Sequence, residues 1–479
     1  MSLKIVSPNT VLANALVHTI DILRPRIAYT KPEKVKFVVG TQINGLPHIG
    51  THLTQCAAFL FAEQVRNIFK VDTSILFGAL DNAPHEVILD PESHHAYQIT
   101  YQHKLGKNCI DSLTQKYYSN LFSRLSERTF VDYEIQTYSE QQSAPNFRLE
   151  FIKTLKELER IRWLVSPSSG IPHIRFPCPK CWWAEKRSER THLIKHNEKE
   201  AEFKSYCFDH MEYSSVISED SDCYLDLSTL YRNIIKESCL INDKKSLHII
   251  VKGGDWVFAC QQIDWALGLL GHAPNNLPVR VFTPQILTDT GAKLSKSLIK
   301  RGAMDIKDDL ENWLIDPDCW DRSEEEYADL LIWTVEELMS DPKHFYRSYS
   351  YKELQRIMKH HISQPSNVPP VRTIRIYRKY FKLIKEGVKT IEIRVGYSSM
   401  KKIKAGQFLK FICQDDKCLT KVNRITEYAS FRELLDSEDT NKINPHISYE
   451  EQLNELSNIF PSNKEALGVL CIELQKVDK

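Results

Sequence analysis

Short apolar runs alternate with longer amphipathic segments in the first part of the chain. Lys36 to Val39 is an apolar run that predicts a strand, and a loop with two glycines and a proline follows it. From Thr51 to Lys70 apolar residues recur at helical spacing, and Thr73 to Gly78 is a second strand-like run. Because parallel strands need a crossover connection, this order predicts a β-α-β unit in a parallel sheet.

A similar order returns about 200 residues later. Ser246 to Val251 predicts a strand, and it ends in a turn made by Gly253, Gly254 and Asp255. A helical stretch follows, and Val279 to Phe282 predicts a further strand. Two such units indicate the α/β fold class.

Two short signals in these segments suggest phosphate chemistry. His48 and Gly50 lie at the predicted N-terminus of the first helix, where backbone N–H groups and the helix dipole favour a phosphate. About 240 residues downstream, Lys293 and Lys296 lie in a loop that can neutralise charge on a leaving pyrophosphate. Alone, the histidine suits a helix cap and the lysines suit a solvated turn, but together they indicate a nucleotide-handling enzyme.

His48-Ile49-Gly50-Thr51 and Lys293-Leu294-Ser295-Lys296-Ser297 resemble the HIGH and KMSKS signatures of class I aminoacyl-tRNA synthetases. The position of the first motif, the Gly253-Gly254-Asp255 turn and a cysteine cluster make the chain most similar to the class I lysyl branch. The resemblance implies a Rossmann-like catalytic domain over residues 1–300 that uses ATP and Mg²⁺ to activate an amino acid, with a lysine-like substrate favoured, and transfers it to tRNA or another RNA.

The resemblance also implies roles for individual residues. His48, Lys293 and Lys296 would be catalytic. Asp81 and His85, which follow the second strand, would contact the substrate together with Gln262, although both also suit an ordinary turn. Thr51 departs from the histidine of many class members. The nucleotide would be bound by Gly40, Pro47, Gly50, Thr51, Gly253, Gly254, Asp255, Ser295 and Ser297.

A connective insertion is expected at about 86–245, with a zinc ribbon at about 176–212. Cys178, Cys181, Cys207 and His210 form two C-x2-C/H knuckles that are typical of a closed, structural Zn²⁺ site. Trp182 and Trp183 beside them suit either stacking on RNA or an apolar cap over the metal.

Beyond the basic loop, residues 301–362 predict a helical segment that is short for a synthetase, and 363–370 read as a polar, proline-containing linker. Residues 371–479 form a further domain whose opening part is basic. Its G-x-K-x-x-E-x-R pattern at 387–394 resembles the signature of ASCH domains, small PUA-like β-barrels, with Lys389, Glu392 and Arg394 as site residues. The resemblance implies RNA binding; a few relatives are hydrolases, but Glu392 stands where those carry a hydroxyl.

Composition limits the remaining choices. The formal net charge is +1, 42% of residues are hydrophobic and 26% are charged, which is typical of a soluble chain, and no apolar stretch approaches a membrane span. We therefore expect a cytoplasmic protein with reduced cysteines and without a membrane or DNA partner. Two alternatives stay open: a synthetase paralogue that aminoacylates a non-tRNA acceptor, and an RNA-binding or RNA-modifying ASCH protein whose synthetase-like domain is non-catalytic.

Overall fold

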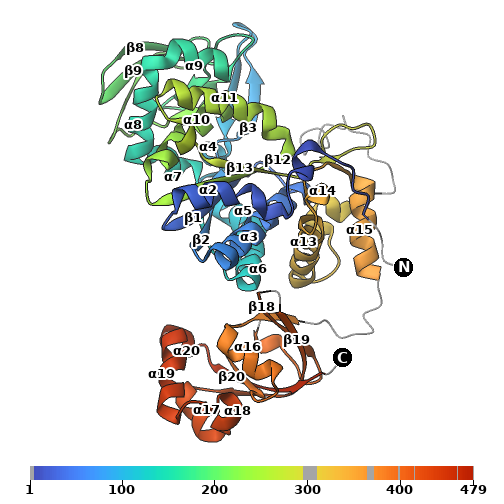
Figure 1. Ribbon diagram of the computed structural model, residues 1–479. Coiled ribbons are helices and arrows are strands. Elements are labelled where there is room, and N and C mark those ends of the chain that lie inside the picture. Colours follow the sequence, from blue (N-terminus) through green and yellow to red (C-terminus); the bar gives the residue numbers. More distant parts are fainter. Residues whose placement is uncertain are drawn as a thin grey trace. The chain divides into compact units, whose positions relative to one another are not determined.

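The computed structural model describes residues 5–294, 310–363, 372–397, 400–414, 416–460 and 462–477, except for the side chains of residues 402, 462 and 463. The chain divides into two compact units, Met1–Ser363 and Gln364–Lys479 (Figure 1). Ser295, Lys296 and Ser297 of the basic loop lie outside the described residues. Within the described part of the chain, no helix combines the length and apolarity that crossing a membrane requires.

A five-stranded sheet forms the centre of the first unit. Its order is β13-β12-β1-β2-β5, and all neighbouring strands are parallel. The strands are β1 (Lys34–Gln42), β2 (Asp72–Leu80), β5 (Asp132–Thr137), β12 (Ser246–Gly253) and β13 (Val279–Thr283). The chain winds outward from β1 in one direction and then from β12 in the other, so the order reverses between these two strands. In open α/β sheets, ligands bind at the carboxyl ends of the strands at this reversal.

The helix α3 (Ile49–Phe69) connects β1 to β2 and is buried on two sides. It packs on the sheet and, on its other side, against α13 (Glu324–Met339). Apolar residues such as Leu53, Phe59 and Phe61 therefore surround the helix, as expected for a helix without a solvent-facing side. Phe61 makes an edge-to-face contact with Phe345 of α14 (Pro342–Phe345), with ring centroids 5.4 Å apart.

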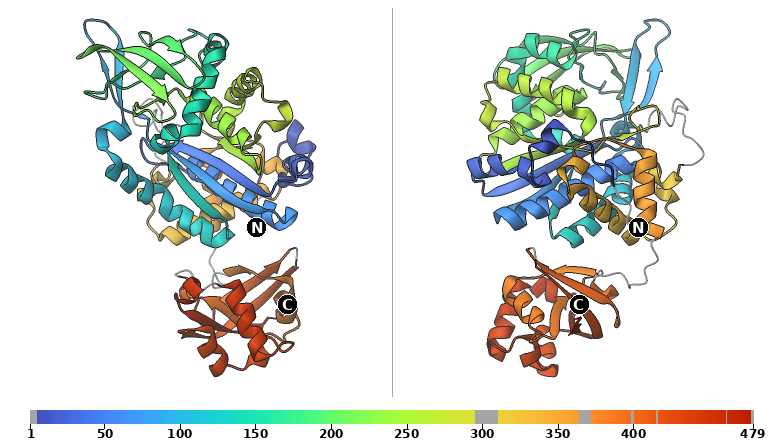
Figure 2. Two further views of the ribbon diagram at one scale, coloured as in Figure 1. Left: turned by 90° about the vertical axis from the view of Figure 1, so that its left-hand side faces the viewer. Right: turned by 45° about the vertical axis from the view of Figure 1, so that its right-hand side comes forward.

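An insertion made by residues 81–105 and 138–228, on either side of β5 and before α10 (Thr229–Asn242), forms one end of the first unit, and α13 and α15 (Tyr351–Ser363) lie at the other (Figure 2). Three small sheets build most of it. Their strands are β3 (Pro84–Leu89), β4 (Ala96–Thr100) and β7 (Ala184–Glu185); β8 (His192–His196), β9 (Glu200–Cys207) and β10 (Met211–Ser218); and β6 (Ile174–Arg175) with β11 (Asp226–Leu227). Its larger helices are α7 (Tyr138–Ser143), α8 (Pro145–Thr154) and α9 (Leu158–Val165).

The remaining elements of the first unit are short or peripheral. They are α1 (Val11–Asn14), η1 (Thr19–Ile22), α2 (Arg24–Thr30), α4 (Tyr101–Leu105), α5 (Lys107–Thr114), η2 (Gln115–Ser119), α6 (Asn120–Thr129), η3 (Leu155–Glu157), η4 (Gly254–Trp256), α11 (Val257–Leu269), η5 (Pro274–Asn276), β14 (Ile286–Leu287), η6 (Asn312–Leu314), η7 (Pro317–Cys319), β15 (Tyr349–Ser350) and α15 (Tyr351–Ser363). Together with the parallel sheet, they confirm the α/β fold class.

The second unit is built on a mixed five-stranded sheet in the order β16-β18-β19-β20-β17. Its strands are β16 (Arg372–Arg375), β17 (Ile391–Val395), β18 (Phe408–Cys413), β19 (Asp416–Tyr428) and β20 (Val469–Lys476), and its helices are α16 (Arg378–Lys385), η8 (Met400–Lys402), α17 (Phe431–Ser437), α18 (Thr440–Ile443), α19 (Tyr449–Ile459) and α20 (Ser462–Glu465). Alternate residues of β20 enter two apolar clusters: Leu470 and Ile472 face the one that includes α16, whereas Val469 and Cys471 face the one that includes α17.

Strands β1 and β2 approach closely at a pair of glycines. Gly40 lies opposite Gly78, and a Cβ on Gly40 would come within 2.9 Å of the Gly78 carbonyl oxygen. Gly40, which lies just before the chain turns toward α3, is therefore required for the close packing of β1 and β2.

We expect Gly40→Ala to lower the free energy of unfolding by about 1–3 kcal/mol, because the two strands must separate to admit the methyl group. Gly268→Ala in α11 is the matched control. A Cβ there meets nothing within 4 Å, so the helix should be unchanged or stabilised by up to about 1 kcal/mol. Urea unfolding of both variants checks this, and equal effects would contradict the close packing.

Candidate active site

A pocket opens at the carboxyl ends of β1 and β12, at the reversal of strand order. Its walls also come from the N-terminus of α3, from β5 and α7, from α10 and from the segment after β13. Of the residues with predicted nucleotide roles, those that line this pocket are Gly40, His48, Gly50, Thr51, Gly253, Asp255 and Lys293. Two sequence segments about 240 residues apart thus share one cavity.

His48 is the N-cap residue of α3. Its backbone is extended (φ −85°, ψ 167°), and its Nδ1 accepts a hydrogen bond of 3.1 Å from the Gly50 N–H. Since a backbone N–H can only donate, a neutral His48 ring carries its proton on Nε2. The imidazole therefore caps the helix through one nitrogen and can donate a hydrogen bond through the other.

Gly50 is needed for this cap. A Cβ at Gly50 would lie 3.0 Å from the His48 ring and 3.3 Å from Ile286. Thr51 lines the pocket next to it, whereas His52 points into the core, where its Nδ1 lies 2.8 Å from the Tyr327 hydroxyl. One step along the helix thus separates a pocket residue from a core residue.

Lys293 is held at the Gly-Gly-Asp turn. Its ammonium group forms an ion pair with Asp255, and both side chains are partly exposed. The backbone before the basic loop is also fixed, because the N–H of Leu294 donates to the Ile286 carbonyl at 2.9 Å and Leu294 is buried. The start of the loop is therefore anchored beside the pocket.

Three basic side chains that the sequence analysis did not single out form one wall of the pocket. We call Arg232, Lys236 and Lys252 the basic wall. Arg232 and Lys236 are one helical turn apart on α10, and Lys252 is the last residue but one of β12. The four-residue spacing on α10 was visible in the sequence, but basic residues at this spacing usually face solvent. Only the fold shows that these face a cavity.

Asp81 is turned away from the pocket. It is buried and accepts hydrogen bonds from the backbone N–H and the hydroxyl of Ser139, at 3.1 and 2.6 Å. Burial raises the pKa of Asp81 to about 6, although the bonds from Ser139 oppose this shift. Asp81 thus fixes the start of α7 instead of a substrate.

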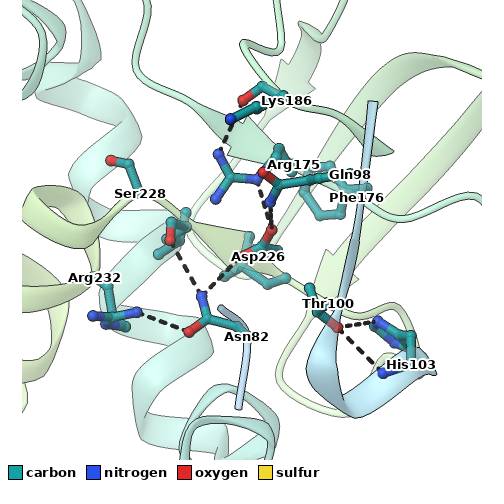
Figure 3. Close-up of polar contacts among 12 residues, drawn as sticks. Asn82, Gln98, Thr100, His103, Arg175, Phe176, Lys186, Asp226, Ser228 and Arg232 are labelled. Carbon is teal, nitrogen blue, oxygen red and sulfur yellow. Dashed lines mark hydrogen bonds and ion pairs between the residues drawn. The ribbon is translucent and has the colours of Figure 1, made fainter. Parts of the chain in front are cut away.

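The next residue, Asn82, joins a buried polar network between the insertion and α10 (Figure 3). Its side chain donates to Asp226 and accepts from Arg232, both at 2.8 Å. Asp226 also pairs with Arg175 at 2.6 Å and accepts from Gln98 at 3.2 Å. The network connects the basic wall to the insertion through uncharged amide groups.

The other two predicted substrate residues also do not line the pocket. His85 packs edge-to-face on Tyr101, with ring centroids 4.7 Å apart. Gln262 lies on α11, beyond the turn that carries Asp255. In the sequence His85 follows a strand and Gln262 follows a glycine turn. The path of the chain after these features places both side chains outside the pocket lining.

Cys178, Cys181, Cys207 and His210 converge in the insertion, with all ligand atoms within 4.8 Å of one another. The Cys181–Cys207 sulfur distance is 3.5 Å, and His210 Nδ1 lies 3.6 Å from the Cys178 sulfur and 3.7 Å from the Cys207 sulfur. A tetrahedral Zn²⁺ with ordinary Zn–S and Zn–N bonds has ligand–ligand edges of about 3.5–3.8 Å. The four side chains therefore fit a closed zinc site.

The two tryptophans beside these ligands have different surroundings. Trp183 packs on Phe208, and their ring centroids are 6.0 Å apart. Phe208 lies between Cys207 and His210 in the sequence. Trp182 stacks on His103 at 4.4 Å and 11° and is 44% exposed. Trp183 thus suits the apolar cap, while Trp182 keeps one accessible edge.

In the second unit, Lys389, Glu392 and Arg394 form a buried chain of contacts. The Lys389 ammonium donates to the carbonyls of Ile391 and Ile443 at 2.7 and 3.2 Å and lies 3.4 Å from the Glu392 carboxylate. Arg394 approaches the same carboxylate at 2.9 Å. Burial lowers the pKa of Lys389, and Glu392 opposes this effect. These contacts hold the ammonium form in a structural position.

Residues 374–478 match the ASCH domain family, so through this region the chain belongs to that family. A hypothetical protein of known crystal structure, PH0355, is 30% identical over 22% of this chain and 97% of its own, with a TM-score of 0.21.

Two synthetase structures are similar over a longer part of the chain. Tyrosyl-tRNA synthetase of Archaeoglobus fulgidus, complexed with L-tyrosine, is 15% identical over 71% of this chain and 92% of its own, with a TM-score of 0.32. Methionyl-tRNA synthetase of Mycobacterium tuberculosis, in complex with methionyl-adenylate, is 12% identical over 76% and 74%, with a TM-score of 0.34. No curated protein sequence matches the chain.

The raised pKa of Asp81 predicts a pH-dependent stability. The folded state binds this proton more tightly than the unfolded chain, so the stabilisation is present below about pH 4 and is lost as the pH rises through about 6. Asp81→Asn removes this effect. Relative to Asp81→Asn, the wild type should lose about 2–3 kcal/mol of unfolding free energy between pH 4 and 7.

Urea unfolding across this pH range measures the difference. Asp72→Asn at an exposed position is the control for removing a carboxylate. Parallel pH profiles for the wild type and Asp81→Asn would contradict a raised pKa at Asp81.

Proposed function

We propose that this protein is a class I synthetase-like ligase that uses ATP and Mg²⁺ to activate the carboxylate of an amino acid. The observation that carries this proposal is the shared pocket: His48 at the N-terminus of α3 and Lys293 at the start of the Lys-x-Ser-Lys-Ser loop both line it. The adjacent strand reversal of a parallel sheet is a common place for a nucleotide.

The reaction needs charge stabilisation more than covalent chemistry. A substrate carboxylate oxygen attacks the α-phosphorus, a new O–P bond forms, and the bond to the bridging oxygen breaks as pyrophosphate leaves. His48 donates from Nε2 to the phosphates, while Lys293 and Lys296 balance the charge that develops on pyrophosphate. Lys293 must exchange its Asp255 partner for phosphate, so Asp255 holds the lysine in place before ATP binds.

The activated acyl group would then pass to a hydroxyl of an RNA, with release of AMP. The ASCH domain is the proposed RNA-binding part. Tyr377 at the start of α16 is 66% exposed, next to basic residues, and offers a stacking surface. Some of the basic charge is already paired, since Arg378 and Lys385 both contact Asp416.

A Zn²⁺ ion held by Cys178, Cys181, Cys207 and His210 is the second part of the proposal. With four protein ligands, the ion would keep no open position for substrate and would act by bracing the insertion. Since Cys207 ends β9 and His210 precedes β10, the metal would stabilise this hairpin against the segment that carries Cys178.

Amino-acid-dependent exchange of labelled pyrophosphate into ATP tests the ligase activity. We expect exchange by the wild type, and we expect Lys293→Met and Lys296→Met to slow it at least about tenfold, because each removes a charge used mainly in the transition state. Lys245→Met at an exposed position is the control and should retain wild-type exchange. Exchange measured with each amino acid in turn also tests whether the substrate is lysine-like, as the resemblance implies.

The outcomes separate the possible functions. Absence of exchange with every amino acid, with and without RNA, would contradict adenylate formation. Exchange without charging of tRNA would favour a different acceptor. Wild-type rates in both lysine variants would contradict the role assigned to the loop.

The zinc site predicts about one Zn²⁺ per chain in the purified protein, measured by elemental analysis. Cys181→Ser and Cys207→Ser should lose the metal and lower the melting temperature, whereas Cys109→Ser, at an exposed position outside the cluster, should keep both. A chelator should destabilise the wild type but not the variants. A metal-free wild type with the same melting temperature would rule out a bracing zinc.

A further inference from the structure

The basic wall concentrates positive charge at one side of the pocket. The Nζ atoms of Lys236 and Lys252 both donate to the same acceptor, Asn233 Oδ1, each at 3.0 Å. The two ammonium nitrogens are therefore no more than 6.0 Å apart. The Asn233 side chain donates in turn to the Thr229 carbonyl at 2.7 Å, which fixes its oxygen between the lysines.

The nearby acid, Glu237, is shared between Lys252 and Arg280, which also pairs with Asp264, so it does not balance every charge of this wall. The Glu237 carboxylate is fully buried and lies 2.7 Å from Arg280 but 3.8 Å from Lys252. Arg232 is bonded to the uncharged Asn82, and the Asp226 carboxylate behind it pairs with Arg175. Among the described residues that line the pocket, the acidic side chain is Asp255, which already pairs with Lys293.

Burial lowers the pKa of both lysines; among the neighbouring charges, Glu237 raises the pKa of each, whereas Arg232 and Arg280 lower it. Burial lowers the pKa of Lys236 to about 7, and the nearby Lys252 lowers it further. Lys252 also lies over the ring of Trp256, 3.7 Å from the centroid, which restricts its position. An anion in front of the wall would stabilise both ammonium groups, whereas a cation would add repulsion.

We infer that the substrate carries a second carboxylate, besides the one that is activated, and that Lys236 and Lys252, assisted by Arg232, bind it. The inference rests on the proposed ligase activity and names its substrate class: a dicarboxylic acid, either an acidic amino acid or a related diacid. A lysine-like side chain has the wrong charge for this wall. Gln136, Thr137 and Gln141, which also line the pocket, are polar and uncharged.

The test is pyrophosphate exchange with matched substrates. Glutamate and aspartate, and the amine-free glutarate and succinate, should support exchange, whereas glutamine, methionine and lysine should support at most about a tenth of that rate, because they lack the second carboxylate. Comparison of glutamate and aspartate with glutarate and succinate shows whether the substrate needs an amino group.

Variants of the wall connect this preference to its residues. Lys236→Gln should raise the KM for the acid by about tenfold or more, since it removes a charged hydrogen-bond donor, and should change the KM for ATP by less than about twofold. Lys236→Arg should recover part of the affinity, and Lys245→Gln is the surface control. A higher KM for ATP alone would overturn the inference, because the wall would then serve the triphosphate.

The result separates this inference from the proposed function. Exchange with a neutral or basic amino acid but not with the acids would overturn the second carboxylate and leave ligase activity intact. If no substrate supports exchange, calorimetric titration of the full chain with glutamate and with lysine still decides. Tighter glutamate binding that Lys236→Gln weakens would support the anion site, and equal or tighter lysine binding would overturn it.

Discussion

The burial of α3 between the parallel sheet and α13 constrains the rest of the first unit. On one side the helix packs on β1 and β2, which approach each other closely at Gly40 and Gly78, where a side chain on Gly40 would meet the neighbouring strand. On its other side, His52 is bonded to Tyr327 of α13. Because both sides of α3 are packed, its orientation is fixed, and its N-terminus places His48 at the pocket.

The same constraint explains why the cap residue is also the candidate catalytic residue. The Gly50 N–H is bonded to His48 Nδ1, and the N–H groups of Thr51 and His52 bond back to the His48 carbonyl. Several of the donors that a helix end normally offers to an anion are thus used inside the protein. The cap sets the tautomer of the ring, so that a neutral His48 has an Nε2–H group to donate.

Much of the fold could be predicted because the responsible signals are local. The runs Lys36–Val39 and Thr73–Gly78 lie within β1 and β2, and the helix predicted from Thr51 to Lys70 is α3 within two residues at its start and one at its end. The strands extend further than their apolar cores because parallel hydrogen bonds continue through the polar ends, as at Lys34. Strand order is not local, because it depends on which distant segments of the chain pair.

Apart from the motifs that the family resemblance connects, such as His48 with Lys293, the site could be predicted only where sequence neighbours stay spatial neighbours. His48 and Gly50 belong to one helix start, so their joint position followed from the motif. Asp81 follows β2 and was expected at the ligand edge, but the backbone and hydroxyl of Ser139 hold its carboxylate in the core. Side-chain direction after a turn depends on distant partners, and residue spacing does not encode them.

Charge balance separates the two buried lysine sites of this chain. Lys389 in the ASCH domain has two carbonyl acceptors and the Glu392 carboxylate, so its ammonium group is satisfied within the fold. Lys236 and Lys252 instead share one amide oxygen at the edge of a cavity, and the Glu237 carboxylate lies closer to Arg280 than to Lys252. A charge that is paired within the fold needs no outside partner, whereas a cluster of cations with too few acids is stabilised by an anion from outside. This difference is why we assign the proposed recognition of substrate charge to the pocket and not to the ASCH lysine.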